Sequence, residues 1–332
     1  MKSDRIEYLD AIKGFAILLV VMGHVDAACY EDWNDVLQKT DIGAMFWWKV
    51  IYSFHMPLFF CVSGYLCKSN GGGKFLLRKT RSLLLPFFSV GLTTSLLMGY
   101  YGTFTVPWFL RTLFIFICMN YSYDVINKLI KIKYEIVRVI YLYALFYVTY
   151  IIFHKYIYLS PIIDSEHFSH FNFYGFLLGI VLQHFHFIEK LNDRNWTFTI
   201  VLTYFIAYLT LMFIYKYYIS YGYLAGVLAV WYLFKNAYTH EKSLRWWSFL
   251  GRHSLEIYLF HFFFIIHIPF VGKCLVDCAE RGGFEWTITA MTIELLYSFA
   301  VGLIVIGLSL LMARLVSCSK LYSFLFLGKL PC

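Results

Sequence analysis

The segment IEYLDAIKGFAILLVVMGHVDAA, residues 6–28, decides the fold class. Its apolar run comes close to the roughly 20 residues that a helix needs to cross the hydrocarbon core of a bilayer. Charged residues enter the run and no small-residue cleavage site follows, so the pattern is not that of a signal peptide. We therefore expect an uncleaved membrane helix whose N-terminus faces the cytoplasm.

The composition extends this expectation to the whole chain. Of 332 residues, 60% are apolar and 14% are charged, whereas about a quarter of the residues in soluble domains are charged. Aromatic residues reach 21%, and many lie near the ends of apolar runs, as in interfacial belts. The formal charge of +8 comes from short connections and forms no single patch. This favours a positive-inside membrane topology with lipid as the surroundings, and no nucleic-acid partner is expected.

The distribution of apolar runs predicts an all-α, polytopic bundle of about ten membrane helices, with both termini cytoplasmic. We expect one membrane domain over residues 1–332 and no fused soluble domain. The connections 68–81, 128–138, 235–252 and the C-terminal tail are basic, whereas 26–49 and the connections near 164 and 280 are acidic or mixed. The expected helices cover residues 6–28, 51–67, 83–101, 108–121, 136–153, 171–187, 197–215, 219–234, 255–271 and 286–311.

Three ionisable residues share one face of the first helix. Lys13 and His24 are eleven residues apart, which is about 20° around a helix and about 16 Å along it, and Asp10 lies one turn before Lys13. Charge inside a membrane span is costly unless it faces a partner, the bundle interior or a wet cavity. The stripe therefore indicates an interior site. The alternative is that Lys13 extends to the cytoplasmic surface and His24 is hydrated at the other end.

Other polar residues suggest further parts of this site. His55 is either a second polar group beside His24 or an interfacial, capping histidine. Arg78 and Arg81 are three residues apart and share a face if helical; guanidinium forks suit phosphate oxygens, although topology alone would also place arginines there. A second set of residues, Cys29, Cys274 and Cys278, shares an expected outer face, where free thiols or a disulfide are both open. Cys-x3-Cys without a nearby His is a weak metal pattern, and no metal is expected.

Taken together, several motifs resemble the membrane acyltransferase-3 family, with the best match to its fucose 4-O-acetylase-like members. The N-terminal third is the specific part of the resemblance. The matching elements are Leu9-Asp10, Lys13-Gly14 and His24; FHMPLFF at 54–60 with Ser63-Gly64-Tyr65; Arg78-x-x-Arg81; Trp108-Phe109-Leu110; and G-x-x-SL-x-IYL-x-H at 251–261.

The resemblance implies an activity. Such proteins have roughly ten membrane helices and move an acyl group, usually acetyl, from cytoplasmic acyl-CoA to an extracytoplasmic acceptor. That acceptor is commonly a sugar hydroxyl of a surface polysaccharide. The family's basic residue, ten intervening positions and His fall on Lys13 and His24, although many members have Arg in the first place. Its Arg-x-x-Arg element falls on Arg78 and Arg81. The resemblance thus implies a multi-pass O-acetyltransferase of the bacterial inner membrane.

We combine these observations into one hypothesis. Lys13, Arg78 and Arg81 hold the phosphates of acetyl-CoA, and the pantetheine arm extends along the first helix toward His24. His24 deprotonates the acceptor hydroxyl or briefly carries the acetyl group. Asp10 pairs with Lys13 or orients it. These residues form the expected catalytic and donor-binding parts of the site.

His55, Trp108 and His261 are expected to line the passage for the acceptor or the acyl group. His261 is expected mid-membrane on the ninth helix, where a packed, hydrogen-bonded histidine is the alternative. A transporter or flippase for a lipid-linked sugar or small solute competes with the enzyme hypothesis, because buried charge also marks translocation paths. Binding or hydrolysis of acetyl-CoA by the purified protein separates the two. A scaffold would have no need of the polar stripe on the first helix.

Overall fold

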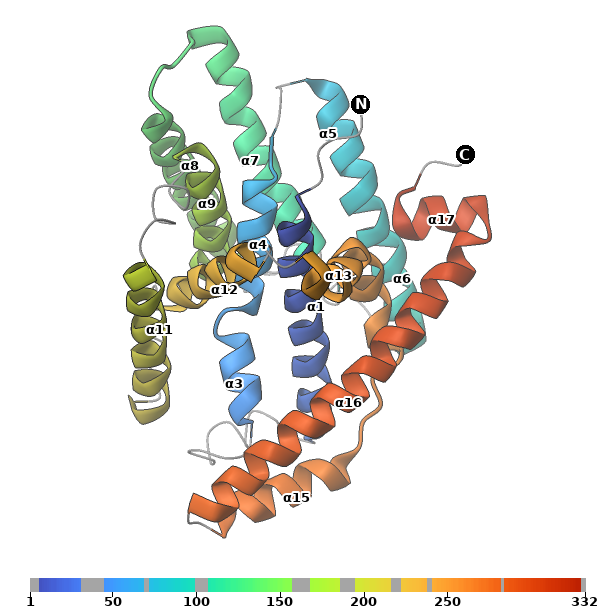
Figure 1. Ribbon diagram of the computed structural model, residues 1–332. Helices are drawn as coiled ribbons and strands as arrows, with labels where there is room; N and C mark the ends of the chain where they lie inside the picture. The colour runs from blue at the N-terminus through green and yellow to red at the C-terminus, as the bar shows by residue number, and fades with distance from the viewer. Residues whose placement is uncertain are drawn as a thin grey trace. The chain divides into compact units, whose positions relative to one another are not determined.

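The computed structural model describes residues 6–30, 45–68, 72–98, 107–156, 168–185, 195–215, 222–237, 241–281 and 284–329. These residues form helices and no strand, which confirms the all-α class (Figure 1). The chain divides into two compact units, each made of two chain segments. Unit 1 comprises Met1–Met56 and Arg194–Ala313, and unit 2 comprises Pro57–Asp193 and Arg314–Cys332.

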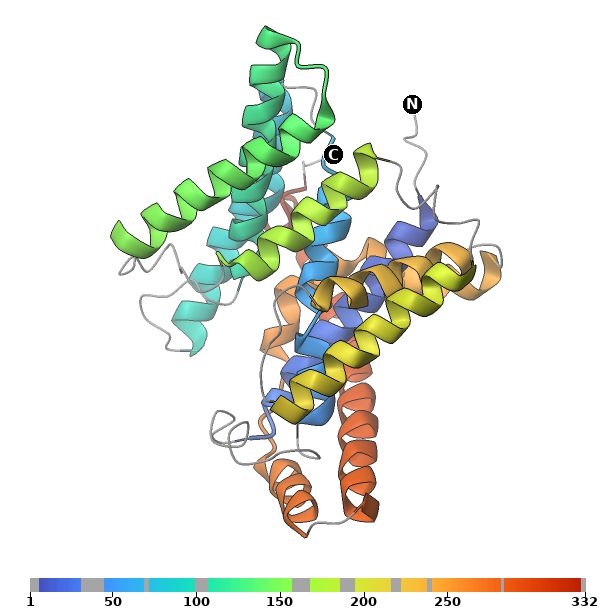
Figure 2. The same ribbon diagram turned by 90° about the vertical axis from the view of Figure 1, so that its left-hand side faces the viewer.

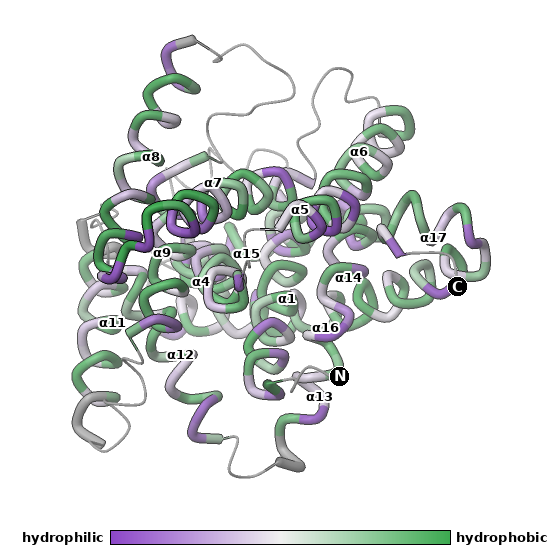
Figure 3. Tube along the Cα trace, turned by 90° about the horizontal axis from the view of Figure 1, so that it is seen from above, coloured by the Kyte–Doolittle hydropathy of each residue, from purple (hydrophilic) through white to green (hydrophobic). Residues whose placement is uncertain are grey.

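Five helical stretches among the described residues are long and apolar enough to cross a membrane, which indicates a membrane protein. Figure 3 shows apolar residues along much of the long helices, whereas hydrophilic residues gather in short helices such as α5 (Gly73–Lys79). The expected count of about ten spans and the cytoplasmic termini stay predictions. The five stretches are Glu7–Ala27, Gly73–Leu97, Trp108–Ile130, Glu135–Lys155 and Glu285–Ser317.

Unit 1 is built around α1 (Glu7–Ala27), whose side chains are mostly buried. Helices α3 (Phe46–Tyr52), α12 (Tyr223–Ala237), α13 (Glu241–Arg252) and α14 (Ser254–Phe260) all contact α1. Helix α11 (Asn195–Tyr215) runs beside α12, as Figure 2 shows. Helices α15 (Pro269–Glu280) and α16 (Phe284–Ser317, up to Ala313 in this unit) complete unit 1.

Two glycines let α1 and α13 touch along their backbones, and Figure 1 shows α13 lying across α1. A Cβ on Gly14 would lie 1.9 Å from the Trp247 carbonyl oxygen, and a Cβ on Gly251 would lie 1.7 Å from the Asp10 carbonyl oxygen. Any larger residue would force the helices apart. This close approach gives a physical reason for glycine at the start of the G-x-x-S motif, and it brings α13 next to the Asp10–Lys13 turn.

Unit 2 contains α4 (His55–Tyr65, from Pro57 onward), α5, a π-helix at Thr80–Leu84, α6 (Leu85–Met98) and α7 (Trp108–Ile130). It also contains α8 (Glu135–Tyr156), α9 (His170–His184) and α17 (Lys320–Leu327). Glycines again allow a close crossing, because a Cβ on Gly179 would lie 1.9 Å from the Cys61 carbonyl oxygen. Phe116 forms the aromatic centre of the unit, with Phe60, Phe146, Phe173 and Phe176 around it.

Several predicted boundaries are wrong. The expected helix 51–67 is two helices, α3 and α4, separated at Ser53 and Phe54, where Ser53 Oγ donates to the Val50 carbonyl at 2.7 Å. The expected helix 83–101 begins ten residues earlier at Gly73, because the helical backbone includes the basic segment that the sequence predicts as a connection. The connection 235–252 contains α13, an amphipathic helix whose apolar side packs on α1.

The expected ninth helix, 255–271, is also wrong as a single helix. It is α14, a short 3-10 turn at His261–Phe263, a stretch without helical structure at 265–268 and then α15. His261 therefore lies at the end of a helix, not in the middle of one. Pro269 lacks an amide hydrogen and is tolerated at the start of a helix, which places it at the first position of α15.

Candidate active site

Three histidines predicted as site residues meet in unit 1. The His24 ring, near the end of α1, lies 5.3 Å from the His261 ring and 4.5 Å from the Phe262 ring, measured between centroids. Tyr52 joins His55 to this group, since its ring lies 4.7 Å from the His55 ring and its hydroxyl lies 3.2 Å from His24 Nδ1. The structure thus brings together His24, His55 and His261, from three different helical elements, with His24 next to His261 and Tyr52 next to both His24 and His55. We call these four residues the histidine cluster.

Backbone carbonyls fix the tautomers of two of these rings. His55 Nδ1 lies 2.8 Å from the Ile51 carbonyl oxygen and His261 Nδ1 lies 2.7 Å from the Tyr258 carbonyl oxygen. A carbonyl oxygen can only accept, so Nδ1 carries the hydrogen in both rings, and Nε2 of the neutral ring is an acceptor. His261 Nε2 is buried with no hydrogen-bond partner among the described residues. The cluster therefore offers basic nitrogens in an apolar enclosure.

The Tyr52 hydroxyl contacts the third ring of the cluster, that of His24. With the Tyr52 hydroxyl at His24 Nδ1, proton placement on that nitrogen decides whether His24 Nε2 is free to accept a proton. Tyr52 itself is held by stacking on Trp48, at 4.1 Å between ring centroids and 20° between planes. Both aromatic residues come from α3, so the position of this short helix sets the geometry at His24.

Helix α3 is anchored by α16. Glu294 is fully buried, and its two carboxylate oxygens accept hydrogen bonds from the backbone amides of Phe46 at 2.9 Å and Trp48 at 3.0 Å. These are first-turn amides of α3, which would otherwise have no helical partner. Trp47 Nε1 adds a bond to the Met291 carbonyl at 2.9 Å. Sequence reasoning did not identify Glu294, although an acid inside a long apolar helix is the same kind of signal as Lys13.

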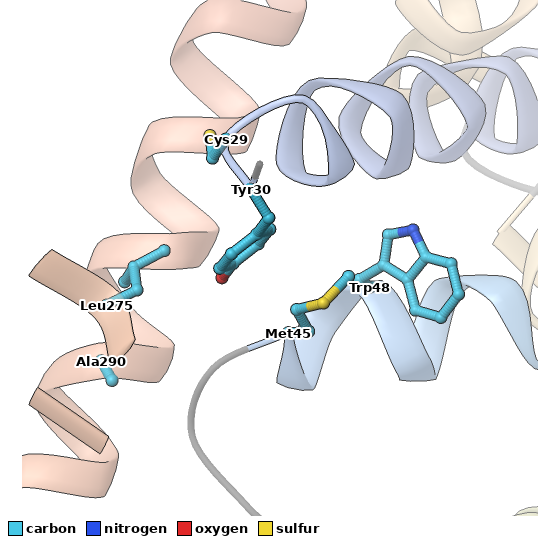
Figure 4. Close-up of a cluster of buried hydrophobic side chains, with 6 residues drawn as sticks. All are labelled: Cys29, Tyr30, Met45, Trp48, Leu275 and Ala290. Carbon is cyan, nitrogen blue, oxygen red and sulfur yellow. The ribbon is translucent and has the colours of Figure 1, made fainter. Parts of the chain in front are cut away.

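A small apolar core lies beside this anchor. It consists of Cys29, Tyr30, Met45, Trp48, Leu275 and Ala290, which come from the end of α1, the start of α3, α15 and α16 (Figure 4). Burial raises the pKa of the Cys29 thiol to about 12. Cys29, Cys274 and Cys278 are free thiols in the structure, so the free-thiol alternative describes it.

Asp26 lies in a different place from the one expected. The charge pattern predicts it at the start of an acidic outer connection, whereas in the structure it is the penultimate residue of α1 and 1% exposed. Its carboxyl group lies next to that of Glu294. The acidic residues expected around it, Glu31, Asp32, Asp35 and Asp41, lie outside the described residues.

The other end of α1 carries the predicted ion pair. Lys13 Nζ lies 2.5 Å from Asp10 Oδ1, and the Asp10 side chain is nearly buried while 23% of the Lys13 side chain is exposed. Ten residues of continuous helix separate Lys13 from His24, which keeps them about 16 Å apart along the axis. Asp10 therefore sits too far along the helix to act on His24, and its contact is with Lys13.

Arg78 and Arg81 lie in unit 2, within one continuous helical stretch. Arg78 is exposed, with its guanidinium 5.8 Å from the centre of the Phe75 ring. Arg81 is half-buried and donates from Nε to the Gly328 carbonyl at 3.1 Å, which ties it to the end of α17. Arg81 belongs to the π-helical turn Thr80–Leu84, and such turns are frequent at functional sites.

Trp108 begins α7 in unit 2 and packs against Phe60 and Phe109, both at 6.3 Å between ring centroids. The next turn carries Arg111, a buried arginine whose guanidinium lies 5.9 Å from the centre of the Phe87 ring. Sequence reasoning missed Arg111, although a cation within an apolar helix is a recognisable functional signal.

A second missed arginine organises the other end of α7. Arg138 Nη1 contacts Asp124 Oδ1 at 2.8 Å and Asn120 Oδ1 at 3.0 Å, and its Nε contacts Glu135 Oε2 at 3.2 Å. The guanidinium also lies 4.5 Å from the centre of the Tyr123 ring. Sequence reasoning treated Arg138 as part of a basic connection. The structure shows it 7% exposed in a network that joins α7 to α8.

No group of three or more His, Cys, Asp or Glu side chains within the described parts of the chain could hold a metal ion. The expectation of a metal-free site stays a prediction. Chemically, unit 1 provides a histidine cluster with acceptor nitrogens at one end of α1 and a cation at the other. Unit 2 provides the paired arginines and Trp108.

Comparison with known proteins gives three findings. The acyltransferase-3 family, described as an acyltransferase domain, matches residues 6–314. The nodulation protein NolL of Sinorhizobium fredii (strain NBRC 101917 / NGR234) is 38% identical over 72 residues, which are 20% of this chain and 17% of that protein. The similarity therefore spans less than a fifth of that relative. No solved structure matches the chain.

Proposed function

This chain belongs to the acyltransferase-3 family of membrane acyltransferases, and from that premise we propose that it is an O-acetyltransferase. The acetyl group comes from cytoplasmic acetyl-CoA, and the acceptor is a sugar hydroxyl of a cell-surface or exported polysaccharide. The bacterial inner membrane is the proposed location. The observation that supports this function best is the histidine cluster, because it places a tautomer-controlled imidazole among further basic nitrogens.

The proposed reaction follows from these groups. His24 Nε2 accepts the proton of the acceptor hydroxyl while the oxygen of that hydroxyl attacks the carbonyl carbon of the thioester. The C–S bond then breaks, and the proton passes from His24 to the departing thiolate, so the reaction needs no outside proton. Tyr52 holds the productive tautomer, and the Nε2 nitrogens of His55 and His261 accept hydrogen bonds from the sugar. A positioned general base contributes about 10²- to 10⁴-fold to such a rate.

The donor part of the proposal uses cations. Lys13 in unit 1 and Arg78 and Arg81 in unit 2 bind phosphates of acetyl-CoA, for which guanidinium forks and an ammonium group are suited. The length of α1 between Lys13 and His24, about 16 Å, suits an extended pantetheine arm. Trp108 lines the acyl or acceptor passage.

The test compares His24→Ala with wild type for acetylation of the surface glycan, with protein level measured in parallel. We expect a loss of about 10²-fold or more. His154→Ala is the matched control, because His154 is a helical histidine bonded to a backbone carbonyl, at 3.1 Å from Tyr150, outside the cluster. Full acetylation by His24→Ala, at normal protein level, would overturn the catalytic assignment.

The donor assignment needs a second design. Lys13→Met alone removes the ion-pair partner of the buried Asp10 carboxylate, so a stability loss could imitate a binding loss. The double variant Asp10→Asn with Lys13→Met removes both charges. Weaker acetyl-CoA binding by the double variant and by Arg81→Ala, with folding intact, is the expected result. Unchanged binding in both would reject the phosphate sites.

A further inference from the structure

One face of α13 combines exposed aromatic rings with exposed cations. Trp246 is 53% exposed, Arg245 and Arg252 are exposed, and Phe249 and His253 are half-buried. Arg245 and Arg252 are seven residues apart on α13, so they lie within about 20° of each other around the helix and form a cationic stripe. Trp246 and Phe249, followed by His253 in the turn between α13 and α14, form an aromatic stripe. The rings are ordered: Trp246 and Phe249 lie 6.3 Å apart at 27°, and Phe249 and His253 lie 4.8 Å apart. We call these five residues the α13 face.

The opposite side of α13 fixes where this face lies. Gly251 packs directly on the backbone of α1 at Asp10 and Gly14, and Ser248 Oγ donates to the Glu7 carbonyl at 3.2 Å. Arg252 follows Gly251 in the chain and Lys13 precedes Gly14, so both cations are one residue from the backbone crossing.

We propose that the α13 face binds the adenosine 3′,5′-diphosphate end of the acyl-CoA donor. This inference rests on the proposed function and adds a nucleotide subsite to it. An adenine ring stacks on aromatic side chains. The 3′-phosphate on the attached ribose carries negative charge, which arginine guanidinium groups bind well. The two stripes match this ligand, because a flat base and a phosphate dianion occupy adjacent positions on one nucleotide.

His253 has a further part in this subsite. Its Nδ1 lies 2.6 Å from Glu256 Oε2, which fixes the plane of the imidazole at the end of the aromatic row. A fixed ring loses little conformational entropy on stacking. Glu256 is itself nearly buried and points its carboxylate at His253. The pair thus orients a ring for stacking without adding an exposed negative charge near the phosphate.

An interfacial role also suits a helix that carries Trp and Arg, and it makes a different prediction. A helix that only rests at the lipid headgroups has no reason to distinguish CoA from dephospho-CoA. The experiment therefore uses the full chain in nanodiscs and measures binding of CoA, dephospho-CoA, adenosine 3′,5′-bisphosphate and S-acetylpantetheine by calorimetry. We expect wild type to bind CoA more tightly than dephospho-CoA.

The variants test each stripe. Trp246→Ala should weaken CoA and adenosine 3′,5′-bisphosphate by roughly tenfold and leave S-acetylpantetheine unchanged, whereas Trp246→Phe keeps a stacking ring and most of the affinity. Arg252→Gln should reduce the preference for CoA over dephospho-CoA. The matched control is Trp286→Ala in the same unit, because Trp286 is also exposed and also faces an arginine, with Arg281 4.4 Å from its ring centre.

The outcomes separate the two proposals. If wild type binds CoA but Trp246→Ala and Arg252→Gln bind all four ligands as wild type does, the α13 subsite is rejected and the proposed function stands. Equal weakening of S-acetylpantetheine would also reject the subsite, since it would indicate general damage. A wild-type protein that binds none of the four ligands overturns both.

Discussion

Replacing Gly251 with alanine should push α13 away from α1 and reduce both stability and acyl transfer. The added Cβ would lie 1.7 Å from the Asp10 carbonyl oxygen, whereas ordinary contact begins at 3.4 Å, so the helices must separate by about 1.7 Å. The opposing atoms belong to the backbone of a buried helix and cannot rotate away. Overpacking of this kind costs about 1–3 kcal/mol, occasionally more, and we expect the upper end here.

The assay is thermal unfolding of the purified protein together with acetyl-CoA binding. Gly307→Ala in α16 is the matched control, because a Cβ there meets nothing within 4 Å and alanine improves helix propensity by up to about 1 kcal/mol. Gly251→Ala should unfold at a lower temperature and bind the donor more weakly, because the Asp10–Lys13 turn lies at the crossing. An unfolding temperature equal to that of wild type would refute the packing argument.

Three other outcomes follow from the site and its supports. Arg138→Leu should lower the free energy of unfolding by about 3–5 kcal/mol, since it removes the guanidinium that contacts the buried Asp124 carboxylate. In the same unfolding assay, the double variant with Asp124→Leu should recover part of the lost stability. Burial raises the pKa of the Cys29 thiol to about 12, so its reactive thiolate fraction is tiny at about pH 8. A maleimide should therefore label the exposed Cys318 before Cys29, which peptide mass analysis would show. Glu294→Ala should speed hydrogen exchange of the α3 amides, because each unpaired buried amide costs about 1–3 kcal/mol, and Glu294→Gln should do so less.

Hydrophobicity predicted much of the fold. The long apolar runs give the all-α class and closely match α1, α8 and α11, because lipid requires each spanning segment to satisfy its own backbone. The same rule failed where polar residues sit inside helices. Arg78 and Arg81 looked like a connection, yet the helix begins at Gly73 before them. Hydropathy alone does not separate a basic loop from a basic helix end.

The residues of the candidate site could be predicted from the sequence, but the residues that hold them in place could not. Helix periodicity places Asp10, Lys13 and His24 on one face, and the ion pair follows from that spacing. Tyr52 and Glu294 were out of reach because their roles depend on contacts between segments 28 and 248 residues apart in the chain. A single sequence does not fix such pairings, since they arise only when α3 docks on α1 and α16.

The stretch 265–268, shortly after His261, has backbone groups that need polar partners. Its backbone forms no helix, and hydrocarbon makes each unpaired amide or carbonyl costly. Helix α1 ends at Ala27, and His267 Nδ1 donates to the carbonyl of Ala28, so two separate chain segments leave helical structure at one level. His24 lies three residues before the end of α1, and His261 lies four residues before this nonhelical stretch. Because such backbone needs water or polar partners, we expect the acceptor to reach the histidine cluster from this side of unit 1.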